Sequence, residues 1–199
     1  CTVLPGNSGG IAVPGGDAAK IAGLAHWLTR QDWTGCAAAA DGADLPTGVL
    51  PRSLLLADHP RAAPVLFTLR ASPDRSRYGL PGSTLYDGAL PLGGGTHGGL
   101  SAAELHTVLI LAGAPVRAGQ LCEWPAGLPD IAPTALALLG LPGGEAMDGR
   151  VLAEALHDGA DPPVPAAPET WEAADGRYAQ RLPRPRLGRQ LSLDAAMRG

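Results

Sequence analysis

The chain has 199 residues, of which 45% are hydrophobic and only 4% aromatic, so one domain with an aliphatic core is expected. A net charge of −4 argues against a nucleic-acid-binding protein, because phosphate binding requires a concentrated basic face. No apolar stretch reaches the roughly 18 residues of a membrane span, so none is expected. The opening residues also lack the basic and apolar regions of a signal peptide.

The first seventy residues alternate between strand and helix patterns. "GGIAVPGG" (residues 9–16) predicts a short strand closed by a turn. "DAAKIAGLAHWLTRQ" (17–31) predicts a helix, with Asp17 as its N-cap. "GCAAAA" (35–40) and "PVLFTLR" (64–70) predict two further strands. This order is typical of an α/β layer, so we predict the α/β fold class.

Residues 71–100 show almost no periodicity, and a loop of this length is usually functional or disordered. The loop ends in "GGGTHGGL" (93–100), where His97 lies among five glycines. Glycine weakens local order and contributes no side-chain packing. We therefore interpret the motif as a loop whose backbone passes close to a ligand or metal.

The later elements are predicted from equally local signals. "TVLILAG" (107–113) is a continuous apolar run and predicts a strand that is buried on both faces. "LPDIAPTALALLGL" (128–141) predicts a helix capped by Asp130 and ended by Gly140. "MDGRVLAEAL" (147–156) predicts a tight Asp148-Gly149 turn and then another short helix.

Domain boundaries follow from a shift in composition near His157. We predict an α/β region over residues 1–157, a Pro-rich linker over 158–170, and a C-terminal tail over 171–199. The tail either adds a small hairpin or stays loosely attached. Its arginines are interpreted as a solvated charge run.

The cysteines are three in number and form no CxxC pair or metal-binding spacing. With an odd count, at least one of Cys1, Cys36 and Cys122 stays unpaired. We expect buried, unreactive thiols.

Five stretches carry a resemblance to a known family. In chain order they are "HPRAAPVLFTL", "YGLPGSTLYDG", "THGGLSAAELHTVLILAG", "LPDIAPTALALLGL" and "MDGRVLAEAL". Together they resemble the type I phosphodiesterase/nucleotide pyrophosphatase branch of the alkaline phosphatase superfamily, over roughly residues 53–156. The resemblance implies the C-terminal part of an alkaline-phosphatase-like α/β/α sandwich with a mixed sheet. Residues 1–157 then form part of a domain whose N-terminal half lies outside this sequence.

The resemblance implies that His97 is a metal ligand in a site for two divalent ions, zinc or manganese. Imidazole suits both metals, and a loop anchored to a buried strand holds it in place. Gly95, Gly98 and Gly99 are expected to let the loop approach the metals. The competing interpretation is a surface histidine in a flexible loop.

Other polar residues receive lesser roles. His106 is the competing candidate for a metal ligand, but the resemblance implies that it is framework near the site. Glu104 could orient His106 or act as an outer partner of the ligand. Asp58 and His59 form an Asp-His pair of the kind that the superfamily uses for its second metal. Pro60 follows instead of the usual glycine, so metal binding there is the less favoured interpretation.

The implied activity is metal-dependent hydrolysis of small phosphate esters. The nucleophile and most metal ligands are expected on the missing half, so this chain alone is expected to be inactive. Two alternatives remain open. One is a sulfatase-like or phosphonate-cleaving relative, and the other is a non-catalytic module that keeps the fold.

Overall fold

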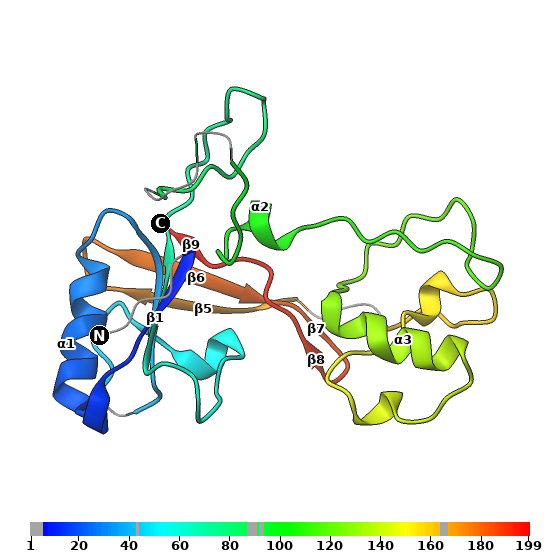
Figure 1. Ribbon diagram of the computed structural model, residues 1–199, viewed down its shortest axis with the longest axis horizontal. Helices are drawn as coiled ribbons and strands as arrows, with labels where there is room; N and C mark the ends of the chain where they lie inside the picture. Colours follow the sequence, from blue (N-terminus) through cyan, green and yellow to red (C-terminus); the bar gives the residue numbers. More distant parts are fainter. Residues whose placement is uncertain (1–5, 43, 87–90, 92–93, 164–166) are drawn as a thin grey trace. The chain divides into compact units, whose positions relative to one another are not determined.

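The computed structural model describes residues 6–42, 44–86, 91, 94–163 and 167–199. The chain divides into two compact units (Figure 1). The first unit consists of Cys1–His106, Thr170–Pro183 and Leu193–Gly199, and the second of Thr107–Glu169 and Arg184–Ser192.

A mixed four-stranded sheet forms the first unit, in the order β1-β4-β2-β3. Its strands are β1 (Ser8–Ile11), β2 (Thr34–Ala39), β3 (Leu50–Pro51) and β4 (Val65–Leu69). β4 runs antiparallel to β1 and β2, whereas β2 and β3 are parallel. The predicted α/β class with a mixed sheet is therefore confirmed.

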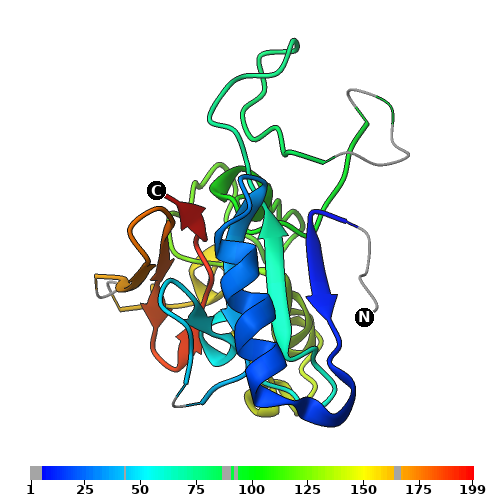
Figure 2. The same cartoon turned by 90° about the vertical axis from the view of Figure 1, so that its left-hand side faces the viewer.

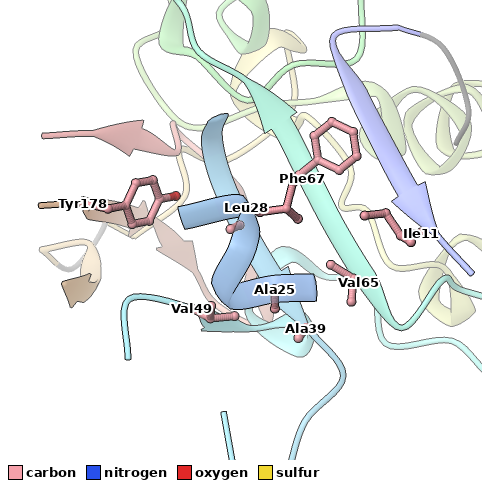
Figure 3. Packing of buried hydrophobic residues seen from close by; sticks show 9 residues of the cluster. Ile11, Ala25, Leu28, Ala39, Val49, Val65, Phe67 and Tyr178 are labelled. Carbon is pink, nitrogen blue, oxygen red and sulfur yellow. The ribbon is translucent and has the colours of Figure 1, made fainter. Parts of the chain in front are cut away.

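Helix α1 (Ala18–Thr29) covers one face of this sheet (Figure 2). The predicted cap is confirmed, because Asp17 Oδ1 accepts a hydrogen bond from the backbone N–H of Lys20 at 3.1 Å. Ala25 and Leu28 on α1 are fully buried. They join an apolar cluster, drawn in Figure 3, that contains Ile11, Ala25, Leu28, Ala37, Ala39, Val49, Val65, Phe67 and Tyr178.

The opposite face of the sheet is covered as well. All six residues of β2 are buried, and their side chains alternate between the two faces. Cys36 and Ala38 pack on the face away from α1, in a second cluster with Leu50, Leu54, Leu182 and Ala196. Cover on both faces explains why β2 is built from small apolar residues.

The C-terminal residues contain strands β5 (Glu169–Ala174), β6 (Ala179–Arg184) and β9 (Met197–Arg198). These form a three-stranded sheet in the order β5-β6-β9. The sequence predicts either a small hairpin or a loosely attached tail here. Tyr178 is 1% exposed, and its hydroxyl donates to the carbonyl of Gly35 in β2 at 2.9 Å. This segment thus contributes to the core of the first unit.

The second unit contains helix α3 (Ile131–Leu138) and the two-stranded sheet β7 (Arg186–Leu187) and β8 (Gln190–Leu191). As predicted, Gly140 follows the end of α3: the helix stops at Leu138, and Gly140 just beyond it has a φ of +65°. The remaining helical elements are α2 (Ala102–Leu105) in the first unit and short 3-10 turns at Pro14–Gly16, Arg52–Leu55, Leu128–Asp130, Gly144–Ala146 and Ala153–Ala155. In the described part of the chain, no helix has the length and apolar character needed to cross a membrane.

The predicted strand over residues 107–113 was wrong. The structure assigns no strand there, and Val108 and Ile110 are 80% and 81% exposed. A strand forms only when a neighbouring strand pairs with its backbone. Among the described residues no strand pairs with this run.

Two predictions around α3 were also wrong. The carboxylate of Asp130 does not cap α3; it accepts hydrogen bonds from the backbone N–H of Gly127 and of Arg150, both at 2.8 Å. The short helix predicted after the Asp148-Gly149 turn is a single 3-10 turn at Ala153–Ala155. Thr134 Oγ1 accepts from the backbone N–H of Leu152 at 3.0 Å, so this backbone bonds to side chains around α3 rather than to its own preceding turn.

Cys36 is expected to resist alkylation in the folded protein. Burial raises the pKa of its thiol to about 12, so almost no thiolate exists near pH 8. Iodoacetamide at pH 8 should label the half-buried Cys122 in the native state and Cys36 only after denaturation, as measured by peptide mass spectrometry. Similar native labelling of both thiols would contradict this assignment. Cys1 lies outside the described residues.

Candidate functional site

His97 lies in the first unit, near the end of the long segment between β4 and α2. Among the described residues of 71–100 there is no helix or strand, only an isolated bridge between Ala71 and Thr84. The described part of residues 71–86 extends away from the sheet (Figures 1 and 2). The imidazole of His97 is exposed and has no hydrogen-bond partner among the described residues.

The backbone just after His97 is held by the carboxylate of Glu104 on α2. Glu104 Oε1 accepts from the backbone N–H of Gly99 at 3.0 Å and from Asn7 Nδ2 at 2.5 Å. Glu104 Oε2 accepts from Ser101 Oγ at 2.8 Å. We call Asn7, Gly99, Ser101 and Glu104 the Glu104 clamp. Because a carboxylate accepts these bonds, each is stronger than a neutral one.

Asn7 connects this clamp to the sheet. It is 2% exposed, and its backbone N–H donates to the carbonyl of His97 at 3.3 Å. Its own carbonyl accepts from Leu69 N–H of β4 at 2.7 Å, and its Oδ1 accepts from Thr84 Oγ1 at 3.1 Å. The loop backbone is therefore fixed to the sheet while the imidazole stays free. Sequence reasoning did not identify Asn7, since no local pattern marks it.

The three glycines singled out from the sequence differ in their surroundings. Gly98 has a φ of +97°, and a Cβ there would lie 3.0 Å from Ser8 Oγ. At Gly99 a Cβ would lie 2.0 Å from Glu104 Oε2. A Cβ on Gly95 meets nothing within 4 Å. Gly98 and Gly99 are thus required by the loop geometry, and Gly95 is not. Gly93 lies outside the described residues.

Replacing Gly99 with alanine is expected to open the Glu104 clamp, because the added methyl group overlaps the carboxylate. We expect a loss of about 2 kcal/mol in the free energy of unfolding, measured by urea denaturation. Gly95→Ala is the matched control and should change stability by less than about 0.5 kcal/mol. Equal effects from the two substitutions would show that the clamp does not hold the loop.

His106 and Glu104, expected together near the site, bind different partners. His106 Nε2 lies 2.6 Å from Asp194 Oδ1. The Glu104 carboxylate is engaged by the clamp instead. Glu104 therefore supports the backbone around His97 and does not orient His106.

Asp58 and His59 belong to a local turn. Asp58 Oδ1 accepts from Arg52 Nη2 at 3.2 Å, and the Asp58 side chain is 68% exposed. His59 Nδ1 accepts from the backbone N–H of Arg61 at 3.1 Å. One side-chain atom of each residue is therefore already engaged in a local hydrogen bond.

The donor set around His97 is incomplete for a metal ion. In the ranges that the structure describes, no group of three or more His, Cys, Asp or Glu side chains converges to hold one. Zinc takes at least three protein ligands in a catalytic site. The described residues therefore do not form a metal site around His97.

No protein-family model, curated protein or solved structure matches this chain.

Proposed function

We propose that this chain is part of a metal-dependent phosphoric ester hydrolase of the phosphodiesterase/nucleotide pyrophosphatase type. In this proposal His97 supplies one ligand to a site for two divalent ions, zinc or manganese. The observation that carries it is an exposed imidazole without a described partner, on backbone fixed by the Glu104 clamp. Metal binding needs a free imidazole nitrogen, and anchored backbone limits the positions that the ring can take.

The same proposal assigns the mixed sheet and α1 to the C-terminal part of an alkaline-phosphatase-like α/β/α sandwich. The mixed parallel and antiparallel pairing of the four-stranded sheet supports it. We place the nucleophile and the remaining metal ligands on segments outside this sequence. The described residues carry no reaction step of their own.

This chain alone should therefore bind zinc weakly and hydrolyse no phosphodiester. Isothermal titration with zinc and an assay with bis-nitrophenyl phosphate test both points, with His97→Ala as the comparison. Tight binding of two zinc ions, or turnover by this chain, would contradict the proposal that the nucleophile and the remaining ligands lie outside this sequence.

The activity itself is tested in the longer protein that the proposal implies. It should hydrolyse bis-nitrophenyl phosphate in preference to nitrophenyl sulfate when zinc or manganese is bound. His97→Ala should lower kcat/KM by at least about a hundredfold, and His59→Ala should leave it unchanged. A preference for the sulfate ester would assign a sulfatase-like activity instead. A protein without metal or turnover would be a non-catalytic module.

A further inference from the structure

We infer that the C-terminal segment Leu193–Gly199, which we call the C-terminal strap, positions α2 and with it the loop that carries His97. The inference concerns the order of residues 99–106. It rests on the proposed function only for the role of this order, which would be to support His97.

One end of the strap is anchored to the core of the first unit. Its strand β9 pairs with β6, beside which it lies in Figure 1. The backbone N–H of Gly199 donates to the carbonyl of Ala179 at 2.9 Å. Arg198 Nη1 donates to the carbonyls of Gln31 and Thr34 at 2.7 and 3.1 Å. The guanidinium also lies 5.1 Å from the ring centroid of Tyr178.

The other end of the strap bonds to the chain on both sides of α2. Before the helix, the carbonyl of Leu100 accepts from the backbone N–H of Ala196 at 2.6 Å. Ala196 is 6% exposed, and Leu100 packs against its cluster. Directly after the helix, His106 Nε2 lies 2.6 Å from Asp194 Oδ1. The strap therefore contacts the residues that flank α2 and spans the helix.

Helix α2 depends on such contacts because it has only four residues. A single helical turn is unstable in water by itself, so outside partners fix its orientation. Glu104 connects α2 to the His97 loop through its hydrogen bond with Gly99. Asp194 and Ala196 of the strap bond to the residues on either side of α2. The order of the loop thus depends on residues near the C-terminus of the sequence.

Amide hydrogen exchange tests the inference, with Asp194→Ala and His106→Ala as the disruptive variants. The reporters are the backbone N–H groups of Gly99, Leu105 and His106, all hydrogen-bonded in the structure. Both variants should raise their exchange rates about fivefold, the effect expected when one exposed hydrogen bond to a carboxylate is lost. His106→Gln keeps an N–H donor for Asp194 and should restore slow exchange.

Asp161→Ala is the matched control, since it removes one exposed side-chain contact, with Arg117, in the second unit. It should leave these three amides unchanged. Unchanged exchange in both disruptive variants would overturn the inference. Faster exchange throughout β4 as well would also overturn it, because the strap would then act on global stability. The experiment uses no metal or substrate, so its outcome is independent of the proposed function.

Discussion

Replacing Gln180 with leucine is expected to lower the free energy of unfolding by about 4 kcal/mol, because three buried polar groups lose their partner. Gln180 is 2% exposed, and its Nε2 donates to the carbonyls of Ala37 and Gly48 at 2.8 and 2.7 Å. Its Oε1 accepts from the backbone N–H of Ala37 at 3.1 Å. The amide thus bonds to β2 as a neighbouring strand would. Leucine fills a similar volume and satisfies none of these groups.

Urea denaturation followed by circular dichroism measures the change. The matched control is Gln31→Leu, because the Gln31 amide makes one exposed hydrogen bond, to the carbonyl of Trp27. The control should lose less than about 1 kcal/mol. Equal losses from the two variants would show that the buried amide is not needed to join the C-terminal strands to β2.

The same position offers a pH test through Gln180→Glu. A buried carboxylate facing the carbonyls of Ala37 and Gly48 has its pKa raised, whereas the protonated acid donates one hydrogen bond. A group with a raised folded-state pKa is stabilising below its unfolded pKa of about 4.3, and that stability is lost as the pH rises through the folded value. The variant should therefore be closer to wild type at pH 4 than at pH 8.

Asp130→Asn is expected to destabilise the second unit by about 3 kcal/mol. Asp130 is fully buried, and its Oδ2 accepts from Gly127 N–H while its Oδ1 accepts from Arg150 N–H and Gln190 Nε2. An asparagine presents one oxygen and one NH2 group. Whichever way the amide turns, a donor then faces a donor.

Hydrogen exchange at the amide of Leu139, which closes α3, measures this effect within the second unit. The matched control is Asp148→Asn, an exposed aspartate in a nearby turn. The control should leave exchange at Leu139 unchanged. An Asp130→Asn variant that behaves like this control would show that the buried carboxylate is not required for the unit.

The elements predicted well are those whose signals are local. The helix begins at its Asp17 cap, and β2 and β4 lie where short apolar runs are bounded by turns. The run at residues 107–113 has the same signal and forms no strand, since pairing depends on neighbours that a local pattern does not contain. The helix predicted after the Asp148-Gly149 turn is only a 3-10 turn at Ala153–Ala155, and the backbone N–H groups before it bond to Asp130 and Thr134.

The candidate site likewise combines a local sequence signal with contacts between residues far apart in the chain. His97 and its glycines are recognisable in eight residues of sequence, whereas the residues that hold them are distant along the chain. Asn7 lies 97 residues from its partner Glu104, and Asp194 lies 88 residues from His106. Neither partner carries a motif. Only the folded backbone brings them together.

The central claim is that the free imidazole of His97 is a metal ligand. Its most direct test is the metal content of the longer protein that the proposal implies, measured by elemental analysis after purification with zinc. The account predicts two ions per chain in the wild type and in His106→Ala, and fewer than two in His97→Ala. Two ions in His97→Ala, or a wild type that retains no zinc or manganese, would contradict it.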